Sequence, residues 1–124
     1  MGKVFVVQNP MKRDPDTGEW VSKYDLRAAE AFGEIVVLLP VHIGPPIPEI
    51  EIAALTRGLA EFKSDDYLLP IGPPAQIGLA FHLALVANGM VRILQWNRTR
   101  VGTLVGGRYI EIVYDLNKAL ANTK

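Results

Sequence analysis

Arginine and aromatic residues gather in one acid-free stretch of the chain, where their chemistry suits an anionic partner. No aspartate or glutamate occurs between Tyr67 and Ile110. The candidate macromolecule contacts in this stretch are Arg92, Trp96, Asn97, Arg98, Arg100 and Arg108. Arginine binds phosphate through two parallel hydrogen bonds, and tryptophan stacks on nucleic-acid bases. Binding of single-stranded nucleic acid is therefore one predicted function, and packing of Trp96 against Tyr109 or Tyr114 across a hairpin is the structural alternative.

A second candidate site is the Gly/Pro-rich loop at residues 71–78, which is predicted to join a strand to a helix. Its candidate ligand contacts are Gly72, Ala75, Gln76 and Gly78. A helix N-terminus beyond the carboxyl end of a strand can bind an anion, so a nucleotide-binding or nucleotide-processing enzyme is an alternative function. The loop lacks the lysine and hydroxyl residue of a phosphate-binding loop, and Pro73 and Pro74 remove two N–H donors. A tight turn in which Gly78 allows close helix packing is the preferred interpretation.

No complete catalytic or metal-binding set is recognisable in the sequence. The chain has no cysteine, and no metal-ligand spacing surrounds its two histidines, His42 and His82. Asp65 and Asp66 are adjacent at the start of a predicted strand, so they would point to opposite faces and poorly share one substrate. We interpret them as a solvated turn or as a pair that terminates the preceding helix. We accordingly expect no catalytic residue, no metal and no cofactor, and we favour a protein that is not an enzyme.

Strands and helices alternate along the chain, and this order sets the predicted fold. Runs of β-branched and aromatic residues predict strands at 4–7, 34–40, 67–70, 91–96 and 108–114. Capping residues and apolar periodicity predict helices at 25–32, 48–62 and 74–87. Turn residues place the tip of an N-terminal β-hairpin at 14–18 and the loop of a C-terminal β-hairpin at 97–107. We expect an α/β fold with one mixed, mostly parallel sheet flanked by about three helices.

Hydrophobic patterns predict which parts of these elements are buried. The almost wholly apolar run at 34–40 is typical of a strand that is buried on both faces. In the predicted helix at 48–62, four apolar residues recur at the spacing that places them on one buried face, namely Ile52, Leu55, Leu59 and Phe62. Residues 116–122 are expected to add a terminal helical turn.

Length and charge place limits on the organisation of the molecule. A chain of 124 residues is expected to form a single domain, residues 1–124. Residues 1–66 carry 11 acidic and 7 basic side chains, whereas residues 67–124 carry 2 acidic and 6 basic ones. These opposite net charges are typical of a nucleic-acid face or of two surfaces that attract each other in a homo-oligomer. The second interpretation, together with the unpaired edge strands of a small sheet, predicts a homodimer. No signal peptide and no membrane-spanning run is recognisable, so we expect a cytoplasmic protein with no membrane partner.

Three segments together resemble a known group of proteins. The first segment comprises residues 4–9 and the turn at 14–19, and the second comprises residues 25–33. The third begins with residues 66–70 and continues through Gln95-Trp96 to residues 108–110. This arrangement is similar to small proteins of unknown function that are encoded by tailed bacteriophages and prophages, and the similarity covers most of the chain. The resemblance implies the cytoplasm of a bacterial host cell and supplies no catalytic residues. It favours a non-enzymatic accessory or regulatory protein that binds a host or phage macromolecule, with a protein as the expected partner.

Overall fold

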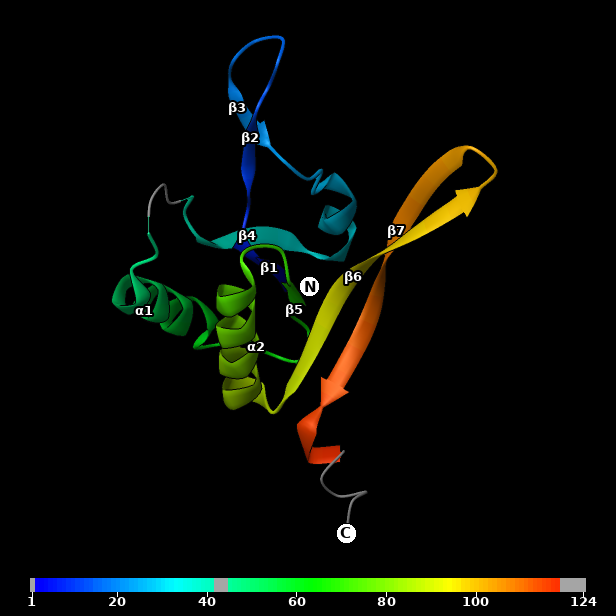
Figure 1. Ribbon diagram of the computed structural model, residues 1–124. Helices are drawn as coiled ribbons and strands as arrows, with labels where there is room; N and C mark the ends of the chain where they lie inside the picture. Colours follow the sequence, from blue (N-terminus) through cyan, green and yellow to red (C-terminus); the bar gives the residue numbers. More distant parts are fainter. Residues whose placement is uncertain (1, 42–44, 119–124) are drawn as a thin grey trace.

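A five-stranded sheet and a separate two-stranded hairpin organise the chain in the computed structural model, which describes residues 2–41 and 45–118 (Figure 1). Across the larger sheet the strands are β4 (Glu34–Leu39), β1 (Lys3–Gln8), β5 (Tyr67–Leu69), β6 (Met90–Val101) and β7 (Leu104–Asp115). The first four are parallel, and β7 runs antiparallel to β6. The hairpin consists of β2 (Met11–Arg13) and β3 (Trp20–Ser22), joined by the predicted turn. The predicted α/β fold, with a mostly parallel sheet and hairpins near both ends, is confirmed.

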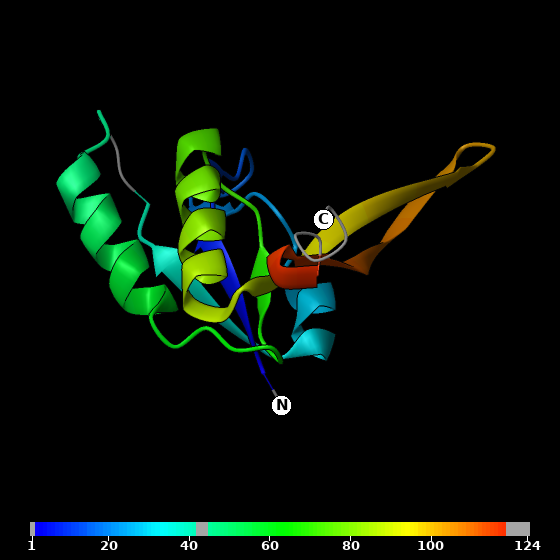
Figure 2. The same cartoon turned by 90° about the horizontal axis from the view of Figure 1, so that it is seen from below.

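Two α-helices cover one face of the sheet, and a short 3-10 helix covers part of the other (Figure 2). The helices α1 (Pro48–Leu59) and α2 (Pro74–Asn88) both begin with a proline, whose missing N–H costs nothing in the first turn. Gly89 ends α2 in the left-handed conformation and donates its N–H to the carbonyl of Leu85. The third predicted helix is η1 (Arg27–Phe32). None of the helices among the described residues is long and apolar enough to cross a membrane.

The core divides into two layers because successive strand residues point to opposite faces. On the α1/α2 side, the helices contribute Leu55, Leu59, Ala80 and Ala84, and the buried strand residues are Phe5, Val7, Leu39, Leu68, Val91 and Ile93. On the η1 side, the buried residues are Val4, Val6, Ala29, Leu69 and Leu94. The second layer is smaller, since six residues of 3-10 helix cannot cover five strands.

Two burial predictions are wrong. The strand β4 lies at an edge of the sheet and is not buried on both faces, because η1 leaves Val37 uncovered at 45% exposure. Ile52 does not join the buried face of α1 but is 49% exposed, whereas Leu55, Leu59 and Phe62 are buried as expected. The helix also ends at Leu59, before Phe62.

The C-terminal hairpin is much longer than predicted. Its two strands pair continuously from Met90 with Asp115 to Val101 with Leu104. The segment 97–107 is therefore not a loop, and the turn contains two residues, Gly102 and Thr103, with Gly102 at a φ of 62° as such tight hairpins require. We call residues 95–110 the arm, because they extend beyond the body of the molecule (Figures 1 and 2).

Two further predictions concern the ends of elements. Asp66 is buried rather than solvated, and its carboxylate accepts the N–H groups of Lys3 and Lys63 at 2.9 Å each. It therefore holds the start of β1 against the turn after α1, which is a structural role. A helical turn follows β7 at residues 116–118, and the rest of the predicted segment 116–122 lies outside the described residues.

Candidate functional site

The order of the strands reverses between β1 and β5, and the carboxyl ends of these two strands mark where α/β sheets bind ligands. In this protein the segments that follow the carboxyl ends of β1 and β5 lie close together. The N–H of Gln8 donates to the carbonyl of Ile71 at 2.9 Å, and Gly72 lies directly against Gln8. A cavity of about 360 Å³ remains above this contact, between the segment 8–10, the loop 70–73 and the pair Lys23-Tyr24.

The four candidate ligand contacts of the loop 71–78 do not converge. Gly72 faces β1, and Ala75 is exposed at the start of α2. Gln76 is buried and turned towards α1, where its amide nitrogen donates to a carboxylate oxygen of Glu51 at 2.7 Å. Gly78 is exposed, and a Cβ at this position would meet nothing within 4 Å, so the prediction that it permits close helix packing is wrong.

A larger groove lies beside that cavity, at the base of the arm. We call it the arm groove, and its volume is about 400 Å³. It is lined by Tyr24, Asp25, Leu69, Pro70, Ile71, Leu94, Gln95, Trp96, Arg98 and Tyr109. Buried Leu69 and Leu94 belong to the sheet, whereas the polar and aromatic residues come from the arm and from the segment before η1. An apolar base with few polar groups around it is the usual character of a ligand site.

The indole of Trp96 forms one wall of the arm groove. Trp96 is paired across the strands with Tyr109, and their rings meet edge to face with centroids 4.9 Å apart. The indole also crosses Gly107, where an added Cβ would come within 2.5 Å of it. The predicted cross-strand packing is therefore confirmed for Tyr109, yet Trp96 remains 46% exposed. Burial raises the pKa of Tyr109, with the nearby charge of Asp25 as a smaller cause.

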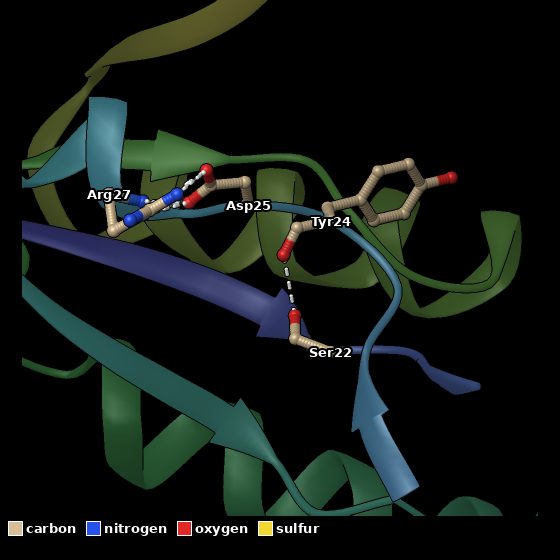
Figure 3. A network of polar contacts seen from close by, with 4 residues as sticks. All are labelled: Ser22, Tyr24, Asp25 and Arg27. Atoms are coloured by element: carbon tan, nitrogen blue, oxygen red, sulfur yellow. Dashed lines mark hydrogen bonds and ion pairs between the residues drawn. The ribbon is translucent and has the colours of Figure 1, made fainter. Parts of the chain in front are cut away.

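The opposite wall comes from the segment that leads into η1 (Figure 3). Asp25 and Arg27 point toward one another and form an ion pair at 2.8 Å. Hydrogen bonds from the side chain and backbone of Arg27 lower the pKa of Asp25 to about 2, so this carboxylate is charged but compensated. The ring of Tyr24 points away from the pair and is 45% exposed, while the hydroxyl of Ser22 donates to the Tyr24 carbonyl at 2.6 Å.

The predicted arginine contacts lie in three separate places. Arg98 lines the arm groove, and Arg100 lies two residues further along the same face of β6. Asn97 and Arg108 are cross-strand partners on the other face. Arg92 lies in the body of the sheet, where it pairs with Glu111 at 3.2 Å. The structure thus brings together Trp96, Arg98 and Arg100, and separates them from the other three.

The sequence patterns did not predict that Tyr24 and Asp25 form a wall of the arm groove. Asp25 was expected only to begin a helix, and its carboxylate does accept the N–H of Arg27 at 3.0 Å. No local pattern marks Tyr24, because its place beside the arm depends on how the chain crosses from β1 to β4. Of the two histidines, His82 is exposed on α2 and His42 lies outside the described residues.

The chain was also compared with known proteins. The model of one family, described as Phage Pam3 gp32-like protein, matches residues 2–116. This range contains all the strands and helices that bear the arm groove. No curated protein and no solved structure matches the chain.

Proposed function

The chain belongs to the Phage Pam3 gp32-like protein family, and on this premise we propose that it is a non-enzymatic accessory or regulatory protein. In this proposal it binds a host or phage macromolecule through the β6–β7 arm, in the cytoplasm of the bacterial host. The expected phage origin of the chain agrees with the family match. The contact surface and the partner are inferences from the geometry of the arm.

One observation carries the proposal: the arm extends beyond the body of the molecule, and its side chains are exposed over most of its length. Its residues from Gln95 to Val101 are all exposed, and near the tip Val101 and Leu104 reach 76% and 75% exposure. A two-stranded hairpin by itself is marginally stable in water. A partner that covers the arm would bury this apolar surface, so the arm is suited to association.

The charge of the arm favours a partner with an anionic surface. Arg98, Arg100 and Arg108 are its only charged residues. Such a local excess of one sign attracts the opposite charge over about 8–10 Å at physiological salt. The alternative function, a nucleotide-binding enzyme, gains no support, because Gly72, Gln76 and Gly78 face three different directions.

We also propose that two copies of the chain associate. The strands β4 and β7 form the two edges of the sheet, and among the described residues no strand pairs with their outer sides. Exposed edges offer unpaired N–H and C=O groups to another chain. The opposite net charges of residues 1–66 and 67–124 support attraction between copies.

The role of the arm can be tested by retention of partners from extracts of phage-infected cells. The immobilised wild-type chain would be compared with the double variant Arg98→Glu, Arg100→Glu. We expect the variant to lose the retained macromolecule, because both substitutions place repulsive charge on the arm without altering the buried core. Mass spectrometry and nucleic-acid staining would identify what is retained.

The matched control is the double variant Arg13→Glu, Arg57→Glu. It changes the net charge by the same amount at exposed arginines of the β2–β3 hairpin and of α1. Retention by this control but not by the arm variant would support the proposal. If both variants retain every macromolecule that the wild type retains, the arm is not the contact surface.

A further inference from the structure

We propose, building on the function proposed above, that the arm groove is a stacking site for the bases of single-stranded nucleic acid. In this assignment Trp96 and Tyr24 flank the bases, and Arg98 and Arg100 hold the adjacent phosphates. It extends the general function by naming the class of macromolecule and the residues that recognise it.

The aromatic groups of the groove are accessible and held in place. Trp96 and Tyr24 are each nearly half exposed, and they come from segments far apart in the sequence. Contact with Tyr109 and the crossing over Gly107 fix the indole, so little freedom remains to be lost when a ring stacks on it. A volume of about 400 Å³ lies within the usual range for small-ligand sites and can admit a planar base.

Positive charge continues from the groove along the arm. Arg98 lines the groove, and Arg100 follows on the same face about 7 Å further along the strand. A chain whose base occupies the groove can therefore continue along β6 with its phosphates near both guanidinium groups. Arginine suits this role because its planar group offers two parallel donors to a phosphate.

The carboxylates close to this path are compensated. Asp25 is paired with Arg27, and Glu111 accepts hydrogen bonds from Arg92 and from the hydroxyl of Tyr67. Their negative charge therefore opposes an incoming phosphate less than free carboxylates would. A duplex fits this arrangement poorly, since its bases are stacked inside the helix and cannot reach Trp96.

The first test measures binding of a fluorescently labelled oligothymidylate by anisotropy. We expect the wild-type chain to bind, and Trp96→Ala to weaken affinity by about 5- to 150-fold, the range found when an aromatic platform is removed. Trp20→Ala is the matched control, because Trp20 is also exposed and also lies beside an arginine, Arg13, with 5.4 Å between guanidinium and ring. This control should bind as the wild type does.

The second test measures the salt dependence of the same binding. For single strands, each neutralised phosphate contributes about −0.7 to the slope of log affinity against log salt. The double variant Arg98→Gln, Arg100→Gln should therefore reduce the magnitude of the slope by about 1.4. A labelled duplex should bind more weakly than the single strand at the same salt concentration.

Two other variants keep the test decisive if Trp96→Ala does not fold. Gly107→Ala introduces a Cβ where the indole now lies and should displace the ring. Tyr24→Ala changes an exposed residue of the opposite wall. Both should weaken binding of the oligonucleotide while circular dichroism remains that of the wild type.

Several outcomes would overturn the assignment. These are no oligonucleotide binding at low salt, equal binding of single strand and duplex, and affinity unchanged in both Trp96→Ala and Tyr24→Ala. If the arm retains a protein from a nuclease-treated extract and no oligonucleotide binds, the nucleic-acid assignment fails and the general function stands. If neither a protein nor an oligonucleotide binds in an arm-dependent manner, both fail.

Discussion

Arg92 joins the arm to the body of the molecule. Its guanidinium lies 4.2 Å from the centre of the Tyr67 ring and donates to Glu111, which also accepts the hydroxyl of Tyr67. Phe32 of η1 packs edge to face on the same ring. One cluster thus links β5, β6, β7 and η1 just before the arm begins. Arg92 therefore has a structural role here, in contrast to Arg98 and Arg100, which are free to meet a partner's phosphates in the proposed site.

Tyr67 gives this cluster a measurable dependence on pH. Burial, followed by the hydrogen bond to Glu111, raises the pKa of Tyr67 above its ordinary value of 10.0. Because the folded-state pKa exceeds the unfolded one, the stabilisation is complete below about pH 10 and is lost as pH rises through the folded-state pKa. We expect the free energy of unfolding of the wild type to fall at alkaline pH, and that of Tyr67→Phe to fall less steeply, as measured by urea denaturation.

Tyr109 provides the internal comparison for this experiment, since its pKa is raised too. Tyr109→Phe should flatten the alkaline decline in its turn, and the double variant should flatten it further. An unchanged decline in both single variants would show that neither phenol is coupled to folding.

The arm contributes little to the core, where only Tyr109 packs against the buried residues of the η1 side. The buried residues of β6 are Val91, Ile93 and Leu94, all before the arm, and β6 pairs with β5 only at Ile93. The pairing beyond Gln95 joins the arm strands only to each other. The arm thus adds accessible surface to the molecule while the sheet is stabilised elsewhere.

Shortening the arm should therefore leave the fold intact. Residues 98–107 can be replaced by Gly-Thr, so that the tight turn joins Asn97 to Arg108. This pair is four residues from the native Val101–Leu104 pair and has the same type of backbone hydrogen bonding. We expect urea denaturation to show a cooperative transition with a loss of less than about 1 kcal/mol. Loss of cooperativity would mean that the arm supports the sheet.

The same elements show how far local sequence determines the structure. Prolines 48 and 74 and Gly89 mark helix ends, and apolar runs mark the parallel strands, so these were predictable within a few residues. The length of the arm was not predictable, because Gly106 and Gly107 are typical of a loop. In the structure, Gly107 lies in a strand and accommodates the indole of Trp96. The edge position of β4 was missed as well, since strand order depends on contacts between distant segments.

The candidate site was predictable only in part, for the same reason. Trp96, Arg98 and Arg100 were identified from their chemistry, although the two arginines were expected in a loop and not on the strand that carries Trp96. Tyr24 could not be, because it joins them only when the chain has crossed from β1 to β4 on the η1 side of the sheet. Conversely, Gly72 and Gln76 had suitable chemistry, but packing against Gln8 and Glu51 directs them elsewhere.

At the scale of the whole molecule, the charge asymmetry of the sequence becomes an asymmetry in space. The acidic half, residues 1–66, supplies β1, β4, α1 and η1, whereas residues 67–118 supply β5, α2, β6, β7 and the arm. Since the sheet order is β4-β1-β5-β6-β7, the acidic half supplies the strands at one edge of the sheet, and the basic half supplies those towards the other edge. Two copies in antiparallel contact could therefore each place a basic side against an acidic one.

The face of the arm opposite the arm groove suits contact between two copies of the chain. Strand alternation places Val101, Leu104, Asn97 and Arg108 opposite the face of Trp96, so the apolar tip is directed away from the arm groove. We expect sedimentation equilibrium to show dimers that dissociate as salt rises, because screening weakens attraction between charged surfaces. Arg108→Glu should weaken the dimer more than Arg100→Glu, which makes the same charge change on the groove face. A wild-type monomer at every concentration would exclude the dimer, and equal effects of the two variants would exclude this face as its interface.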